Sequence, residues 1–381
     1  MKHKPSRRTF LQAGLMLPAA ELISSSSRDA SSQSLPGVTY RTLGKTGLKV
    51  SGVGFGLGFT PDPEVIARAI DLGVNYFDTS RVYGQGASER IFGEAIKGKR
   101  DKIVISTKSG SRTKADILKD MDTSLKTLGT DHVDVYHLHA RDTPQRAPEE
   151  AIEALQIVKQ QGKTRAIGIS THDPNFMADY VIQCKLDVVQ TTYSYAIGAP
   201  FRDAAIKKLQ DAGIGVIAMK VVIALSGIGL KDFEQKPKLR TEEVPIAAIK
   251  WVLRNPAIGT TVPHHGNVKE LEMNVQAMTG SYTPDDEKLL YVRNEEIRPF
   301  YCRMCYQCKE QCPQGVPVSE ELRFLAYNDF GGDLFQARMS FMDLPRKVRN
   351  VRCSECSSCA IRCPNGVLVR DRLIRAQELL A

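Results

Sequence analysis

Short apolar runs alternate with longer amphipathic stretches from about residue 40 to residue 285. The apolar runs are four to nine residues long and rich in β-branched and aromatic residues, a composition typical of buried strands. The expected strands are 49–57, 74–80, 102–108, 132–139, 164–170, 187–193, 214–220 and 260–263. The amphipathic stretches, with apolar positions at helical spacing, include 63–73, 115–129, 148–162, 201–213 and 242–255. Several of them end in glycine, as helices commonly do.

Eight strands that alternate with helices predict a (β/α)8 TIM barrel over residues 37–290. An open doubly wound sheet is the alternative, but no G-x-G-x-x-G turn opens a helix. Four glycines lie within and just after the first expected strand, where they allow close backbone approach: Gly52, Gly54, Gly56 and Gly58. By themselves they indicate dinucleotide binding only weakly.

Ionisable residues stand at the ends of neighbouring expected strands. In chain order they are Asp78, Tyr83, Lys108 and His139. Catalytic residues of a TIM barrel lie at the C-terminal ends of its strands, so four such residues together predict an acid–base site. His137, two residues before His139, is interpreted as a packed, hydrogen-bonded core histidine, and His172 as a candidate substrate contact.

Eight of the nine cysteines occur in two copies of the pattern C-x2-C-x2-C-x3-C-P. The copies are Cys302, Cys305, Cys308 and Cys312, then Cys353, Cys356, Cys359 and Cys363. This spacing is typical of two [4Fe–4S] clusters, in which the fourth cysteine of each motif ligates the other cluster. It predicts a small α-helical dicluster ferredoxin-type domain over residues 291–381. The remaining cysteine, Cys184, is interpreted as a buried apolar residue.

Disulfide bonds and zinc sites account for the cysteines less well than iron–sulfur clusters do. A disulfide framework gives no reason for a repeated spacing that ends in Cys-Pro. Structural zinc sites favour two separated C-x2-C pairs rather than four cysteines within eleven residues.

The N-terminal residues 1–36 resemble a twin-arginine signal followed by a serine-rich linker. Ser-Arg-Arg-Thr-Phe-Leu spans 6–11 and precedes a modest apolar stretch. We therefore expect export by the twin-arginine translocase to the periplasm, with a mature start between about residues 20 and 36. A disordered basic tail is the alternative, and the protein is then cytoplasmic.

Composition adds little to this picture. The formal charge is +9, of which +3 lies in residues 1–35, with five Lys/Arg and two Asp/Glu. Two thiolate-ligated clusters would offset about four more positive charges, so nucleic-acid binding has little support. No apolar run reaches the ~18 residues of a membrane span. A basic stretch, Arg346, Lys347, Arg349 and Arg352, is either solvated or a contact for an acidic partner.

Three segments of the expected barrel together resemble the aldo-keto reductase family. They are GVNYFDTSRVYG (73–84), SLKTLGTDHVDVYHLH (124–139) and GKTRAIGIS (162–170). With the cysteine motifs, the chain is similar to the iron–sulfur branch of that family. The resemblance implies that Tyr83 protonates a substrate carbonyl and that His139 orients it. Lys108, paired with Asp78, would lower the pKa of the tyrosine, and a nicotinamide would supply hydride.

The resemblance also implies contacts to NAD(P)H. The matching residues are Ser170, Gln190, Met219, Lys220 and Asn274. Met219 stands where the family has a tyrosine that stacks on the nicotinamide, and Lys220 is placed to meet a phosphate. His264 and Glu270 stand where a lysine and an arginine usually bind the 2′-phosphate, so NADH becomes plausible beside NADPH.

These features favour an oxidoreductase that transfers hydride between nicotinamide and a small carbonyl or alcohol substrate. Two [4Fe–4S] clusters would relay electrons to a redox partner protein or a quinone-linked donor. The alternative is an electron-transfer or docking protein whose barrel no longer turns over nicotinamide. A third hypothesis makes the clusters structural.

Overall fold

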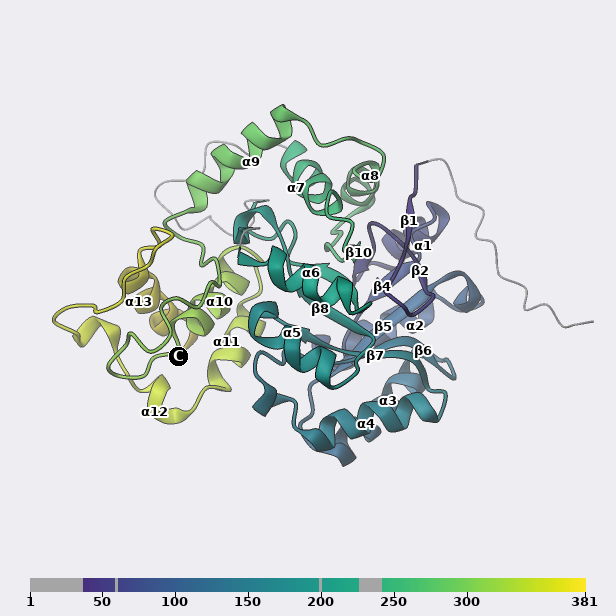
Figure 1. Ribbon diagram of the computed structural model, residues 1–381, viewed down its shortest axis with the longest axis horizontal. Coiled ribbons are helices and arrows are strands. Elements are labelled where there is room, and N and C mark those ends of the chain that lie inside the picture. The colour runs from purple at the N-terminus through teal and green to yellow at the C-terminus, as the bar shows by residue number, and fades with distance from the viewer. Residues whose placement is uncertain (1–36, 59–60, 199–200, 226–241) are drawn as a thin grey trace, which may run out of the picture. The chain divides into compact units, whose positions relative to one another are not determined.

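Eight parallel strands form a barrel with helices on its outside (Figure 1). The computed structural model describes residues 37–58, 61–198, 201–225 and 242–381. The strands pair in sequence order and are β3 (Phe55–Gly56), β4 (Tyr76–Asp78), β5 (Val104–Ser109), β6 (Val133–Leu138), β7 (Thr164–Thr171), β8 (Val188–Thr192), β9 (Gly215–Met219) and β10 (Ile258–Thr261). The predicted barrel is confirmed. The predicted leader, residues 1–36, lies outside the described residues.

Glycines allow the first and last strands to meet and close the barrel. Gly56 forms a parallel bridge with His264, and the amide of Gly54 donates to the Thr261 carbonyl oxygen over 2.8 Å. A Cβ atom on Gly56 would lie 2.7 Å from the carbonyl oxygen of Val262, too close for any side chain. The glycines of this segment therefore serve barrel closure.

The first expected strand, 49–57, is divided in the structure. Its start forms β2 (Lys49–Ser51), which pairs antiparallel with β1 (Tyr40–Thr42), and only Phe55–Gly56 joins the barrel. The hairpin is apolar on one side and packs on inward-facing barrel residues, which explains why the run divides. The residues of this cluster include Leu43, Leu48, Val50, Tyr76, Val104, Val135 and Ile217.

The outer helices follow the barrel strands, and their buried faces form the main hydrophobic core with them. They are α1 (Pro63–Asp71), α2 (Ala87–Ala95), α3 (Lys114–Leu128), α4 (Glu149–Gln160), α5 (Pro174–Gln183), α6 (Asp203–Asp211), α7 (Glu243–Leu253), α8 (Val268–Gln276) and α9 (Pro284–Ile297). The predicted boundary at 290 falls inside α9. Among the described residues, no helix combines the length and apolarity needed to cross a membrane.

The C-terminal region is helical, as expected, and contains α10 (Val318–Asp329), α11 (Leu334–Met342), α12 (Arg346–Arg349) and α13 (Val369–Leu380). Phe324 and Leu325 of α10 pack with Phe341 of α11 and Leu380 of α13 in a small core. A second core gathers apolar residues around the cysteine loops. The barrel and the C-terminal region belong to one compact unit.

Candidate active site

The four ionisable residues predicted from the sequence meet at the carboxyl end of the barrel. Asp78 is the last residue of β4, and Lys108 is the next-to-last residue of β5. His139 follows β6 directly, and Tyr83 begins the short 3-10 helix η1 (Tyr83–Gly86). Because the strands are parallel, their carboxyl ends share one rim and bring these side chains together.

Asp78 and Lys108 form a buried ion pair. The Lys108 Nζ atom lies 2.6 Å from Asp78 Oδ2 and 2.8 Å from the carbonyl oxygen of Thr79. Ser106 Oγ donates to Asp78 Oδ1 over 2.8 Å, and Gln190 Nε2 donates to Oδ2 over 2.9 Å. Burial lowers the pKa of Lys108, and Asp78 opposes that shift. The carboxylate thus fixes the lysine in place and keeps it charged.

Tyr83 lies against both Lys108 and His139. Its ring centroid is 5.4 Å from Lys108 Nζ and 5.6 Å from the centroid of His139, with the two rings edge to face. Burial raises the pKa of Tyr83, and the charge of Asp78 raises it further. The expectation of a lowered pKa is therefore wrong for the protein alone, because burial and then Asp78 raise it.

His139 is held as a neutral imidazole. Its pKa lies well below the ordinary value, chiefly because of burial and then because of the nearby charge of Lys108. The Nδ1 atom lies 3.3 Å from Ser80 Oγ. His137 lies deeper in the barrel, where burial and Lys108 lower its pKa to about 3, and its place in the core is confirmed. The expected hydrogen bonds are absent, since neither ring nitrogen has a partner among the described residues.

Gln190 provides a test of whether the site suits a nicotinamide. Its amide nitrogen is engaged by Asp78, but its buried Oε1 atom has no hydrogen-bond partner among the described residues. An unpaired buried acceptor is costly, and a carboxamide N–H would satisfy it. Ser170 Oγ, in contrast, already accepts from the amide of Ala140 over 2.8 Å. The residues present therefore fit a nicotinamide through Gln190.

Lys220 points toward the C-terminal region. It follows Met219, the half-buried last residue of β9, in a left-handed conformation with φ of 61°. Its Nζ atom lies 4.3 Å from the centroid of the Tyr327 ring in α10. The structure thus places this lysine against an aromatic ring. The phosphate contact expected from the sequence stays a prediction.

The expected adenosine-binding segment surrounds the start of α8. Asn274 is buried, and its Nδ2 lies 3.2 Å from His265 Nδ1, while His265 Nε2 lies 3.2 Å from the Gly54 carbonyl oxygen. Glu270 is exposed, and its Oε2 accepts from the amide of Gly266 over 2.8 Å. A carboxylate therefore occupies the loop amide that would otherwise be free for a phosphate group.

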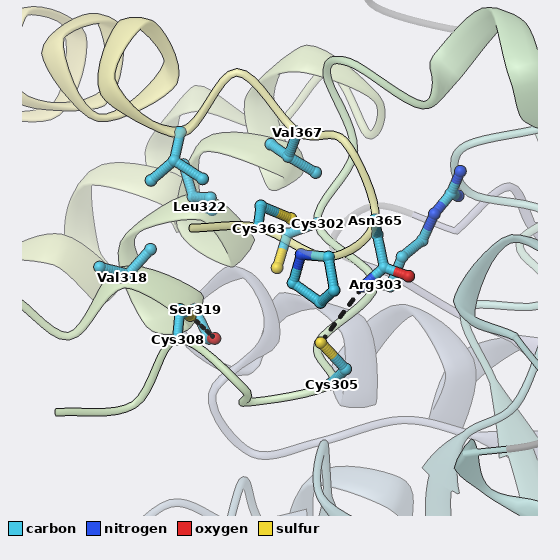
Figure 2. A pocket seen from close by; sticks show the side chains of 12 residues that line it. Cys302, Arg303, Cys305, Cys308, Val318, Ser319, Leu322, Cys363, Asn365 and Val367 are labelled. Atoms are coloured by element: carbon cyan, nitrogen blue, oxygen red, sulfur yellow. Dashed lines mark hydrogen bonds between the residues drawn. The ribbon is translucent and has the colours of Figure 1, made fainter. Parts of the chain in front are cut away.

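Four cysteines line one pocket of the C-terminal region (Figure 2). Cys302, Cys305 and Cys308 come from the first motif, whereas Cys363 is the fourth cysteine of the second motif. This is the crossed ligand set that the spacing predicts. The lining of the pocket is largely apolar and includes Val318, Leu322 and Val367.

Hydrogen-bond donors surround the sulfurs of this pocket. Asn365 Nδ2 lies 3.3 Å from Cys305 Sγ, and Ser319 Oγ lies 3.2 Å from Cys308 Sγ (Figure 2). Among the described residues, no three Cys, His, Asp or Glu side chains lie close enough to share a single metal ion. Thiolates around an apolar space, with donors to sulfur, fit an iron–sulfur cluster.

The second cysteine set is arranged around Cys353. Its amide donates to Gln377 Oε1 over 2.9 Å, and burial raises the pKa of its thiol to about 11. Cys356 and Cys312 are among the groups whose charge raises this pKa further, so Cys312 lies near the second motif. A second crossed set, with Cys312 as the ligand from the first motif, stays a prediction.

Two buried arginines connect the first cysteine loop to the barrel. Arg202, which is 2% exposed, donates from Nη2 to the Met304 carbonyl oxygen over 3.0 Å. Arg303 donates from the loop in the opposite direction, to the carbonyl oxygen of Ala196 over 2.5 Å. Nothing in the local sequence indicates this exchange, because each arginine meets its acceptor about 100 residues away.

The barrel rim also contacts α10 through residues that sequence reasoning missed. Arg323 Nη2 lies 3.3 Å from Asp142 Oδ2, and its Nη1 lies 2.6 Å from His172 Nδ1. Tyr327, one turn later, has its hydroxyl 3.4 Å from His172 Nε2. A charged Arg323 between Leu322 and Phe324 was the available signal that this helix has a buried polar partner.

Comparison with known proteins supports both parts of this description. Residues 62–290 match the model of the Aldo/keto reductase family, and residues 295–368 match the 4Fe-4S dicluster domain. L-galactose dehydrogenase of Arabidopsis thaliana is 30% identical over 282 residues, covering 64% of this chain and 88% of that protein. An uncharacterized oxidoreductase, YqkF, of Bacillus subtilis is 27% identical over 288 residues, covering 65% of this chain and 93% of that protein.

A solved structure gives the same result for the barrel. The holo form of aldo-keto reductase AKR11C1 from Bacillus halodurans superposes with a TM-score of 0.57 at 26% identity. The match covers 67% of this chain and 96% of the AKR11C1 chain. The barrel, its family match and these relatives make the protein an oxidoreductase of aldo-keto reductase type with a 4Fe-4S dicluster domain. The chain belongs to the aldo/keto reductase family.

Proposed function

We propose that the protein reduces a small carbonyl substrate, or oxidises the corresponding alcohol, with NADH, and that two [4Fe–4S] clusters connect this reaction to an external redox partner. The observation that carries the proposal is the assembled set of Tyr83, Lys108, Asp78 and His139 at the barrel rim. A bound nicotinamide would supply or accept the hydride, held through its carboxamide by Gln190.

The chain's own residues would manage the proton and the carbonyl oxygen. The raised pKa of Tyr83 keeps its hydroxyl protonated at neutral pH, so Oη can donate a proton to the carbonyl oxygen as negative charge develops there. Lys108 places a positive charge beside the ring and stabilises the phenolate left behind. Neutral His139 can donate one hydrogen bond to orient the carbonyl.

The preference for NADH is proposed from Glu270. Its carboxylate lies where a 2′-phosphate would approach the start of α8, and it would repel that phosphate. We expect Glu270→Arg to shift the ratio of dissociation constants toward NADPH by about 10- to 100-fold, the range of one charge-assisted hydrogen bond. Fluorescence titration with both nucleotides measures the ratio.

Two further variants control this experiment. Glu270→Gln keeps an oxygen for the Gly266 amide and removes only the charge, so it isolates the repulsion. Glu272→Arg makes the same charge change two residues later, on a side chain that pairs with Arg68. An equal effect of Glu270→Arg and Glu272→Arg would refute a specific role for Glu270.

The clusters would exchange electrons with a partner at the C-terminal region. The basic stretch around α12 supports an acidic partner, since Arg346, Lys347 and Arg352 are exposed. We also propose that the protein is exported by the twin-arginine pathway, which transports folded proteins and so admits clusters inserted beforehand. An external partner would then replace a nicotinamide pool that is not expected outside the cytoplasm.

Anaerobic mixing of the purified protein with NADH, and separately with NADPH, tests the proposed connection. We expect the broad absorbance near ~400 nm of oxidised clusters to bleach with NADH and more weakly with NADPH. Iron analysis should give about eight atoms per chain. Carbonyl turnover without bleaching would refute the connection between barrel and clusters. Absence of both carbonyl turnover and bleaching would favour the alternative, an electron-transfer protein with an inactive barrel.

A further inference from the structure

Helix α10 of the dicluster region contributes side chains to the catalytic end of the barrel. Arg323 and Tyr327 lie four residues apart, on one face of the helix. They meet Asp142 after β6, His172 after β7 and Lys220 after β9, all at strand ends on the rim that carries Tyr83. The catalytic rim is therefore built by both regions of the chain.

Lys220 and Tyr327 repeat, across the two regions, the pairing of Lys108 with Tyr83. Lys220 Nζ lies 4.3 Å from the Tyr327 ring centroid, and Lys108 Nζ lies 5.4 Å from that of Tyr83. Tyr327 is also among the groups that raise the pKa of Tyr83, after burial and Asp78. Lys108 is near the end of β5 and Lys220 directly follows β9, so the two pairs stand on the same carboxyl rim of the barrel.

The charges at the second pair do not balance. The first lysine, Lys108, is matched by Asp78, and Arg323 is matched by Asp142 at 3.3 Å. Lys220 has no carboxylate within 4.0 Å among the described residues, and its neighbour is the ring of Tyr327. A half-buried cation beside a second, fully buried cation needs an anion to offset it.

The buried polar groups here have unused hydrogen-bonding capacity. Arg323 is 4% exposed, yet its Nε atom has no partner among the described residues. His172 adds no charge of its own, because burial and then Arg323 lower its pKa to about 3. An ordered network therefore holds Arg323 and Tyr327 in place while one cation, Lys220, stays available to a ligand.

We propose that Lys220, Tyr327 and Arg323 form an anion subsite that selects carbonyl substrates bearing a carboxylate, 2-oxo acids in the simplest case. The carboxylate would accept from Lys220 Nζ and the Tyr327 hydroxyl, while the carbonyl oxygen faces Tyr83. This subsite rests on the proposed carbonyl reduction. It makes substrate choice depend on the dicluster region.

A charged probe and its neutral ester test the subsite. Phenylglyoxylate and methyl phenylglyoxylate differ by one negative charge, and both are titrated calorimetrically into the full-length holoprotein with NAD⁺ present, so that neither is reduced during the titration. Reduction of each compound is followed separately as NADH oxidation. We expect Lys220→Met to weaken phenylglyoxylate binding about 10- to 100-fold and ester binding less than about 3-fold. Tyr327→Phe, which keeps the ring, should weaken the acid about 3- to 10-fold.

Control measurements separate the subsite from folding and from the proposed reaction. Lys126→Met removes an exposed lysine of α3 and should change neither titration. Equal losses for acid and ester, or weaker NADH binding with unchanged acid binding, would overturn the subsite. Lys220-dependent binding of the acid without reduction of either compound would support the subsite and refute the proposed reaction. Reduction of both compounds with no effect of Lys220→Met would support the proposed reaction and refute the subsite.

Discussion

Replacement of Tyr83 by phenylalanine should lower carbonyl reduction about 10²- to 10⁴-fold, the range expected for loss of a general acid. The change removes only the hydroxyl, so the ring stays beside Lys108 and His139. The measurement is NADH oxidation under single-turnover conditions, with iron content and cluster absorbance determined on the same sample. Both of the latter should be unchanged, because Tyr83 lies in the barrel.

Tyr291→Phe is the matched control, since Tyr291 is an exposed tyrosine of α9. Turnover by Tyr83→Phe equal to that of Tyr291→Phe would refute the role of Tyr83 as the acid. The pH profile gives an independent check. Because burial raises the pKa of Tyr83, the acid should stay protonated from neutral pH to at least about pH 10, and loss of its proton should not slow reduction within that range.

Cys363→Ala should empty the pocket of the first motif, although Cys363 belongs to the second. Cys302, Cys305 and Cys308 share one pocket with Cys363, so removal of any of the four should cost the same cluster. Iron content should fall from about eight to about four atoms per chain. The measurement is iron and sulfide analysis after anaerobic purification, with electron paramagnetic resonance of the reduced protein.

Double variants make this prediction decisive. Cys302→Ala combined with Cys363→Ala should retain about four irons, because both changes affect one cluster. Cys302→Ala combined with Cys353→Ala should retain almost none. Loss of all iron in both pairs would show instead that each motif binds its own cluster.

The sequence was sufficient for the barrel and the cysteine arrangement because both depend on regular spacing. Strand ends in a parallel barrel share one rim, so the positions of Asp78, Lys108 and His139 along the chain already placed them together. A strand-like run, in contrast, does not specify its partner. The run that starts at Lys49 therefore read as one strand, whereas the hairpin with Tyr40–Thr42 takes its first three residues.

Other features depended on contacts between residues far apart in the chain. The direction of Lys220 could not be read from its place after β9, because its partner Tyr327 lies more than 100 residues later. The pKa of Tyr83 was misjudged for a similar reason. Local pairing with Lys108 suggested a lower value, but burial by surrounding elements dominates.

The reciprocal contacts of Arg202 and Arg303 make the barrel and the dicluster region hard to separate. A barrel shortened before the first cysteine motif would leave the Arg202 guanidinium without its acceptor on Met304 and the Ala196 carbonyl without its donor. Each such group costs about 1–3 kcal/mol when buried and unpaired. Truncating the gene at this junction, or transplanting one region alone, would therefore break these hydrogen bonds. The barrel and the dicluster region are expected to be inherited together.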